Sequence, residues 1–262
     1  MLYFHSWSGG KDSTASVILD HIHGLPPSKI IFSEVMFDNS RGISGELPEH
    51  IDFVMNRAKP LFEEWGYSVE IVRAEKDYMT LFNHVVERSR KEERIGKKVG
   101  FLIGGRCSAN RDLKISPIRS FYKGLNLAES EYTQYVGIAV DEPIRLERLR
   151  GTNKISLLEQ FGYTEQMAFD LCKEYDLLSP TYEISARGGC WFCPNQSYKQ
   201  IAWLKREHPE LWEELRILSK DTETVSTRFK YEDSFEDADR KANAINARLR
   251  QEAAQMTLFN LL

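Results

Sequence analysis

The first two thirds of the chain alternate between short apolar clusters and longer stretches with helical spacing. The apolar and aromatic residues 2–7 run into a glycine pair, and residues 12–23 then carry apolar side chains at the spacing of a helix. The same pattern predicts further strands at residues 29–37, 67–73 and 135–140, and helices at residues 48–65 and 164–175. Strands and helices that alternate in this way predict an α/β fold. Its parallel sheet should be covered by helices on both faces, with ligands at the carboxyl ends of the strands.

Helices are also expected in a charged segment and in the C-terminal third of the chain. Residues 78–98 are expected to form an increasingly charged helix, whose mixed signs are typical of a solvated face. After Ser197 the chain is predicted to be helical to its end, apart from a polar interruption at residues 221–237. We therefore expect an α/β domain over residues 1–200 and a helical C-terminal extension over residues 201–262.

Composition and charge exclude several classes of protein. The 262 residues are 42% hydrophobic and 28% charged, with a net charge of -4, which is the balance of an ordinary globular protein. That charge argues against a surface coated with positive groups for nucleic acid. Residues 1–6 lack an export signal, and no apolar run approaches the length of a membrane span. We expect a cytoplasmic protein without a membrane partner.

The turn after the first predicted strand carries candidate phosphate chemistry. It consists of Ser8, Gly9, Gly10, Lys11, Asp12 and Ser13. Glycines let the backbone approach a phosphate closely, and the following helix presents free N–H groups and its positive dipole end. Lys11 supplies a cation, while Asp12 is suited to position Mg²⁺ or to cap the helix. The spacing differs from the G-x-x-x-x-G-K-[ST] of P-loop NTPases, so it does not indicate their γ-phosphate hydrolysis. A capped glycine turn without a ligand is the simpler alternative.

This loop resembles the signature of the PP-loop ATP pyrophosphatases, also called adenine nucleotide α-hydrolases. The resemblance implies a five-stranded-type parallel sheet and ATP accompanied by Mg²⁺. It also implies cleavage of ATP at the α-phosphate, with Lys11 and Asp12 as catalytic residues. The groups implied to hold the pyrophosphate are Ser8, Gly9, Gly10, Lys11 and Ser13.

Later segments resemble one family of this superfamily, the phosphoadenosine phosphosulfate (PAPS) reductases. They follow the order of that family and extend over roughly residues 1–200. The matching segments are Phe37–Ser40 with Glu46–Glu49, Arg106–Cys107 with Asp112–Pro117, Gly137–Leu146, Leu178–Tyr182 and Gly188–Pro194. The resemblance implies nucleotide contacts from Asp38, Lys114 and Arg145, with Asp38 also catalytic. The first arginine of the family's Gly-x-Arg-x-x-Glu-Ser element is absent here.

A second departure from the family changes the expected chemistry. PAPS reductases attack sulfur with a cysteine in a C-terminal Glu-Cys-Gly-Leu-His segment, and no cysteine lies between Pro194 and Leu262. We therefore expect a PAPS reductase-like enzyme that adenylates a substrate with ATP, releases pyrophosphate and supports sulfur transfer. One alternative is a sulfonucleotide reductase that acts on PAPS or adenosine phosphosulfate (APS) with an external thiol. The other is a non-catalytic nucleotide-binding module.

The four cysteines predict a metal centre rather than a disulfide framework. Cys190 and Cys193 can face one metal, and Cys107 would add a third thiolate. Cys172 is the candidate fourth ligand, although its place on a predicted helix favours packing as a small buried hydrophobe. In these cysteines the chain resembles sulfur-inserting PP-loop proteins, which implies a [4Fe–4S] cluster. Zn²⁺ and unligated thiols are the alternatives.

Two segments bear on macromolecular partners. The basic residues within 88–98 could contact phosphates of a nucleic-acid substrate, although a solvated helix explains them more simply. Gln255–Phe259 resembles the Gln-x-x-Leu-Phe peptide by which bacterial proteins dock on the DNA sliding clamp. The favoured alternative is that this tail folds back and completes the core of the extension.

Overall fold

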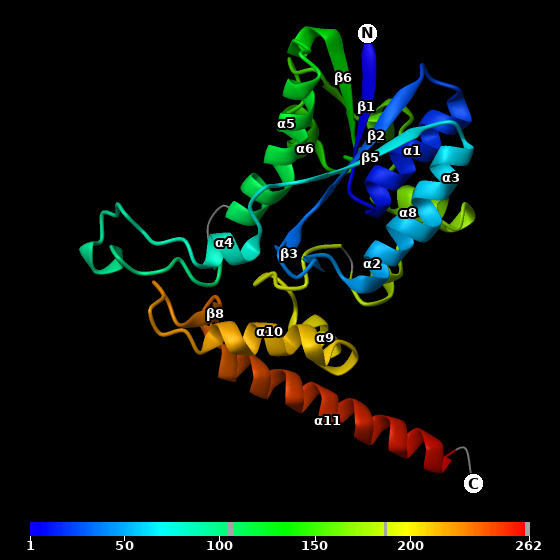
Figure 1. Ribbon diagram of the computed structural model, residues 1–262. Coiled ribbons are helices and arrows are strands. Elements are labelled where there is room, and N and C mark those ends of the chain that lie inside the picture. Colours follow the sequence, from blue (N-terminus) through cyan, green and yellow to red (C-terminus); the bar gives the residue numbers. More distant parts are fainter. Residues whose placement is uncertain (104–106, 186–187, 260–262) are drawn as a thin grey trace. The chain divides into compact units, whose positions relative to one another are not determined.

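The computed structural model of the chain describes residues 1–103, 107–185 and 188–259. Its contacts divide the chain into two compact units (Figure 1). The first unit comprises Met1–Glu75 and Asn110–Gly188, and the second comprises Lys76–Ala109 and Gly189–Leu262. This division differs from the boundary predicted at residue 200, because the excursion between the two parts of the first unit belongs to the second.

A parallel sheet forms the centre of the first unit (Figure 1). Its five strands are β1 (Leu2–Trp7), β2 (Ser28–Glu34), β5 (Ser68–Arg73), β6 (Tyr132–Val136) and β7 (Lys154–Ile155). They lie in the order β5-β2-β1-β6-β7, and each neighbouring pair is parallel. The predicted α/β class with a five-stranded parallel sheet is therefore confirmed.

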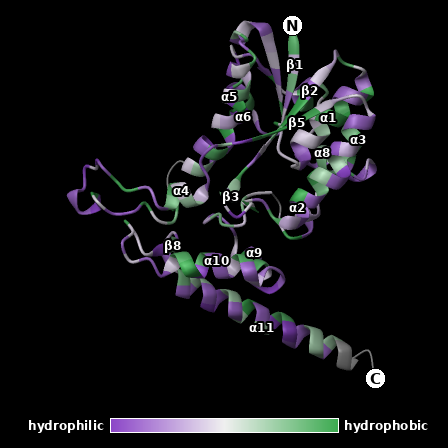
Figure 2. Ribbon diagram, viewed as in Figure 1, coloured by the Kyte–Doolittle hydropathy of each residue, from purple (hydrophilic) through white to green (hydrophobic). Residues whose placement is uncertain are grey.

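Apolar side chains on both faces of the sheet hold helices against it. The helices that cover it are α1 (Lys11–His23), α3 (Lys59–Glu64), α5 (Ser116–Gly124) and α8 (Glu165–Glu174). On one face Trp7 and Ile30 are buried in one core with side chains of α1, α3 and α8. On the other face Phe4 and Ile31 pack with Tyr122 of α5. The hydrophobic colouring of β1 and β2 in Figure 2 reflects this burial on both sides.

The order of the strands creates a switch point beside β1. From β1 the chain passes through α1 to β2 on one side, whereas β6 lies on the other side of β1. In open α/β sheets ligands bind at such a point, outside the carboxyl ends of the strands. The segments that follow β1 and β6 meet there. Gly137 directly follows β6, and a Cβ on it would lie 2.4 Å from the amide nitrogen of Ser13, so the approach requires glycine.

Shorter elements complete the first unit. The helix predicted at residues 48–65 is present as three consecutive segments, namely α2 (Pro48–Asp52), a π-helical segment (Phe53–Ala58) and α3. β3 (Met36–Asp38) and β4 (Ile43–Ser44) form an antiparallel pair. The other elements are α6 (Pro143–Glu147), α7 (Leu157–Gln160), a π-helical segment at Asn110–Ile115, and 3-10 turns at Glu129–Glu131 and Pro180–Glu183.

The second unit is mainly helical and contains a small hairpin. Its elements are α4 (Tyr78–Phe82), α9 (Tyr198–Glu207), α10 (Pro209–Ser219), β8 (Arg228–Lys230), β9 (Asp233–Ser234) and α11 (Phe235–Phe259). Trp212 of α10 stacks on Phe235 of α11, with ring centroids 4.6 Å apart. The predicted helices after Ser197 are present, and the polar interruption contains the hairpin. Across the described residues, no helix combines the length and apolarity needed to cross a membrane.

The helix predicted over residues 78–98 is wrong. The structure has the short α4 and, further on, a 3-10 turn at Glu92–Arg94. The many charged residues beyond α4 leave the segment without a continuous apolar face. Tertiary packing therefore has nothing to bury, and a long helix is not stabilised there. Val85 and Lys98 instead form an antiparallel bridge, and Lys98 also bridges to Thr224. The mixed charges of this segment therefore lie on a loop.

The C-terminal helix α11 bears mixed hydrophilic and hydrophobic positions (Figure 2) and continues to Phe259. Met256 is 68% exposed. The side chains of Leu258 and Phe259 lie outside the described residues, so docking of Gln255–Phe259 on a sliding clamp stays a prediction.

Candidate active site

The loop between β1 and α1 has the backbone geometry of an anion site. Gly9 has a φ of +71°, and a Cβ there would lie 2.5 Å from Cε1 of His50. Gly10 is the N-cap of α1, and its carbonyl accepts the first helical hydrogen bond from the amide of Thr14 at 2.9 Å. The amides of the first turn therefore have no carbonyl partner within the helix. Such amides, together with the helix dipole, attract phosphate.

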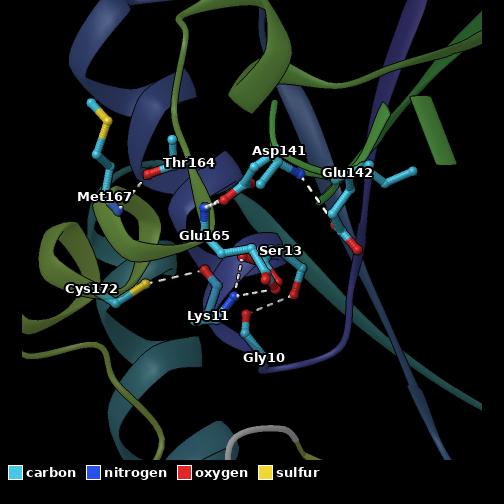
Figure 3. Close-up of polar contacts among 12 residues, drawn as sticks. Gly10, Lys11, Ser13, Asp141, Glu142, Thr164, Glu165, Met167 and Cys172 are labelled. Atoms are coloured by element: carbon cyan, nitrogen blue, oxygen red, sulfur yellow. Dashed lines mark hydrogen bonds and ion pairs between the residues drawn. The ribbon is translucent and has the colours of Figure 1, made fainter. Parts of the chain in front are cut away.

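Two serines close this loop onto its own backbone. The amide of Ser8 donates to Oγ of Ser13 at 3.2 Å, and the two hydroxyl oxygens are also 3.2 Å apart. The Ser13 hydroxyl donates to the carbonyl of Gly10 at 3.0 Å (Figure 3). Because the single hydroxyl hydrogen of Ser13 is used in that bond, the Ser8 hydroxyl is the donor between the two serines. The predicted loop residues are thus brought together in one tight turn.

Two carboxylates bind the ammonium of Lys11 (Figure 3). Its Nζ lies 2.7 Å from Oδ1 of Asp12 and 2.9 Å from Oε1 of Glu165. Burial alone would lower the pKa of Lys11, but the two hydrogen bonds outweigh it and the pKa is raised. Lys11 is therefore a firmly held cation at the helix end, and Asp12 and Glu165 balance its charge.

Further carboxylates lie around this cation. Burial raises the pKa of Asp12, the hydrogen bond from Lys11 opposes that shift, and the charges of Glu165 and Glu142 reinforce it. Asp141 accepts the backbone amide of Glu165 at 3.1 Å and so fixes the start of α8 (Figure 3). An excess of carboxylates over ammonium groups favours an additional cation beside Asp12.

Asp12 also fits a magnesium ion that arrives with a nucleotide. Within residues 1–103, 107–185 and 188–259, no three His, Cys, Asp or Glu side chains are arranged as a metal-binding group. Mg²⁺ usually takes only one or two carboxylates and completes its shell with substrate phosphates and water. Asp12, next to the phosphate-binding turn, is suited to that role and stays the predicted magnesium ligand.

Asp38 lies at the end of β3, where its carboxylate holds the following turn. Oδ1 accepts the amide of Ser40 at 2.9 Å and its hydroxyl at 2.6 Å, and Oδ2 accepts Nε of Arg41 at 2.7 Å. These hydrogen bonds from Ser40 and Arg41 lower the pKa of Asp38 to about 2. Asp38 is therefore an anion that shapes its own turn, and its catalytic role stays a prediction.

The other two predicted nucleotide contacts each pair with a glutamate. Nζ of Lys114 lies 3.4 Å from Oε1 of the buried Glu46, and the charges of both residues act on His50 beneath the loop. Arg145 pairs with Glu142, one of the carboxylates that influence Asp12. The contacts of Lys114 and Arg145 with a nucleotide therefore stay predictions.

Three residues that the sequence did not single out contact the loop directly. The hydroxyl of Tyr182 accepts the amide of Lys11 at 2.8 Å, Nε2 of His50 lies 3.0 Å from the carbonyl of Ser8, and Glu165 binds Lys11. Tyr182 lies within a segment that resembles the PAPS reductases, and His50 directly follows another. That resemblance could have pointed to both residues, whereas no local signal marks Glu165.

Together with burial, three of the four cysteines raise the pKa of Tyr78 in the second unit. Burial raises the pKa of Tyr78, and the charges of Cys190, Cys107 and Cys193 raise it further. The amide of Cys193 donates to the carbonyl of Cys190 at 3.0 Å, which closes the Cys-x-x-Cys turn. These soft donors suit zinc or an iron–sulfur cluster, although ligation would have to draw the thiols closer together. Arg106, beside Cys107, lies outside the described residues.

Cys172 belongs to the first unit and has a different environment. It is a fully buried core residue of α8, and its thiol donates to the carbonyl of Lys11 in α1 at 3.2 Å (Figure 3). Burial raises the pKa of Cys172 to about 12. Because a metal binds the thiolate, these surroundings suit the packing alternative better than ligation.

Cys190→Ser is expected to remove the bound metal, whereas Cys172→Ser should retain it. Ser lacks the soft thiolate that zinc and iron–sulfur centres require, and Cys172 is engaged elsewhere. Iron, labile sulfide and zinc are measured after anaerobic purification of both variants. Iron with sulfide supports the cluster and zinc alone supports a structural site. Full metal content in Cys190→Ser contradicts the predicted ligand set.

No protein-family model matches the chain, and no curated protein matches it. Fold and site geometry therefore carry the functional argument.

Proposed function

We propose that this protein is a PAPS reductase-like enzyme of the PP-loop type, which binds ATP and cleaves it at the α-phosphate to adenylate a substrate. The observation that carries the proposal is the position of Ser8–Ser13. This segment leaves the carboxyl end of β1 at the switch point of a parallel sheet and enters α1 through Gly9 and Gly10. Lys11 and Asp12 lie in the first helical turn, beside the expected pyrophosphate.

The proposed reaction needs stabilisation of a departing anion. A substrate oxygen attacks the α-phosphorus, the bond to the bridging oxygen breaks, and pyrophosphate leaves as AMP is transferred. Lys11 and the first-turn amides of α1 stabilise the charge that develops on the pyrophosphate. Before ATP binds, Asp12 and Glu165 both bind the ammonium of Lys11, and the pyrophosphate would replace the more exposed Glu165 there. Mg²⁺, when bound at Asp12, would neutralise part of the phosphate charge.

Sulfur transfer is the proposed purpose of the adenylation. A substrate oxygen is a poor leaving group until adenylation makes it part of AMP. A sulfur nucleophile then displaces AMP from the substrate. Cys107, Cys190 and Cys193 would hold a [4Fe–4S] cluster or zinc for this second stage. The absence of any cysteine after Cys193 makes direct reduction of PAPS or APS the weaker alternative, because that reaction needs an attacking thiolate.

Product analysis with ATP tests the proposed function. We expect the purified protein, supplied with Mg²⁺, ATP and cellular RNA or small-molecule fractions as acceptors, to form AMP and pyrophosphate. Release of ADP and phosphate contradicts cleavage at the α-phosphate. Sulfite release from PAPS or APS with an added thiol identifies the reductase instead. Nucleotide binding without any product identifies a binding module.

A further inference from the structure

The phosphate loop rests on a buried imidazole. His50 of α2 is 4% exposed. Its Nε2 lies 3.0 Å from the carbonyl oxygen of Ser8, and its Nδ1 lies 2.8 Å from Oγ of Ser179. The same ring occupies the space that a Cβ of Gly9 would need, with Cε1 at 2.5 Å and Nε2 at 2.7 Å. The backbone of the loop therefore packs directly on the ring.

These partners define which ring nitrogen carries hydrogen. The carbonyl of Ser8 can only accept, so Nε2 carries a hydrogen and donates it. Burial lowers the pKa of His50 and Lys114 acts in the same direction, against the opposing effects of Glu46 and the Ser8 carbonyl. The ring is therefore neutral, and its bare Nδ1 accepts the hydroxyl hydrogen of Ser179.

The hydrogen bond to Ser8 sets the direction of one peptide group. In a trans peptide the C=O and N–H point in opposite directions, so the N–H of Gly9 points away from the ring. If this peptide turned over, a carbonyl oxygen would replace the N–H and repel a phosphate. We propose that His50 is a positioning residue, which holds the Ser8–Gly9 peptide with its N–H toward the bound pyrophosphate group. The identity of that anion rests on the proposed function.

Two amide substitutions separate this role from general packing. His50→Gln carries an amide N–H close to the position of Nε2, so it keeps the bond to Ser8. His50→Asn reaches only the position of Nδ1, so it can meet Ser179 but leaves the Ser8 carbonyl without its donor. Both variants place an amide in the same buried site and therefore share the cost of burying it.

The probe is inorganic pyrophosphate, and its binding to the full chain is measured by calorimetry. We expect His50→Gln to bind within about threefold of the unmodified protein, and His50→Asn to bind roughly tenfold more weakly or worse. Melting temperatures of both variants show whether folding is retained. Equal affinities for the two variants, or normal affinity in His50→Asn, overturn the proposal.

A measurement on the unmodified protein remains decisive where a variant does not fold. Nitrogen NMR at pH 7 should show His50 as the neutral tautomer with hydrogen on Nε2. A hydrogen on Nδ1, or a doubly protonated ring, overturns the proposal. Failure of the proposed function gives a different result. If the variants bind pyrophosphate in the expected order but the protein does not cleave ATP, the proposed enzymatic activity is wrong and the positioning role of His50 stands. Absence of pyrophosphate binding in the unmodified protein overturns the positioning role itself.

Discussion

Lys11→Ala is expected to reduce ATP-dependent pyrophosphate release by about 10²- to 10³-fold. Negative charge develops on the pyrophosphate as it leaves, and loss of one preorganised group that meets such charge costs about this much in kcat. Asp12→Ala should also abolish most turnover, because Asp12 fixes the Lys11 ammonium at 2.7 Å and is the predicted magnesium ligand. The measurement is the initial rate at saturating ATP, with ATP affinity determined separately.

Lys59→Ala is the matched control for these variants. Lys59 forms an exposed ion pair with Glu63 one helical turn away, and such pairs contribute only about 0.3 to 0.5 kcal/mol to stability. Its turnover should equal that of the unmodified protein. Full activity in both Lys11→Ala and Asp12→Ala would contradict the assigned site. Weaker ATP binding with unchanged kcat would limit Lys11 to a binding role.

Local pattern predicted β1, β2, β5, α1 and α8 because each is continuous in sequence and buries apolar side chains, whereas it did not predict α5 and β7. β1, for example, ends at Trp7, where Ser8 and the glycine pair follow. The helix predicted at residues 164–175 appears as α8, which Thr164 caps by accepting the amide of Met167 at 3.2 Å (Figure 3). Periodicity and capping suffice where an element packs along its whole length.

The excursion at Lys76–Ala109 shows where this approach fails. Its charged residues suit an exposed helix by propensity, but a helix needs a face to bury before it becomes stable. The ammonium of Lys98 instead pairs at 2.6 Å with Asp221, which is 123 positions away in the sequence. No window of local sequence contains both partners, so neither the loop nor its membership of the second unit was predictable.

The same distinction holds within the candidate site. Ser8–Ser13 was predictable because the loop supplies its own glycines, hydroxyls and cation in one segment. Glu165 reaches Lys11 across 154 positions and Tyr182 reaches the Lys11 amide across 171, and only the topology of the sheet brings them there. Asp38, chosen by resemblance, proved to hold its own turn. Contacts to a loop from distant elements are therefore the part that sequence left open.

Gly137→Ala is expected to lower stability and to suppress pyrophosphate release together. The added Cβ would lie 2.4 Å from the amide nitrogen of Ser13 and 2.5 Å from the carbonyl carbon of Asp12, and these backbone atoms cannot rotate aside. Overpacking of this kind costs about 1 to 3 kcal/mol, or roughly 2 to 4 °C of Tm per kcal/mol at this chain length. The relief must come from displacement of the α1 N-terminus, and a shift of about 1 Å in a positioned group can cost about 10²-fold in rate.

Gly124→Ala is the control, since nothing lies within 4 Å of its added Cβ and it should leave both Tm and turnover nearly unchanged. Normal activity in a folded Gly137→Ala protein would show that the junction of β6 with α1 does not set the geometry of the phosphate loop.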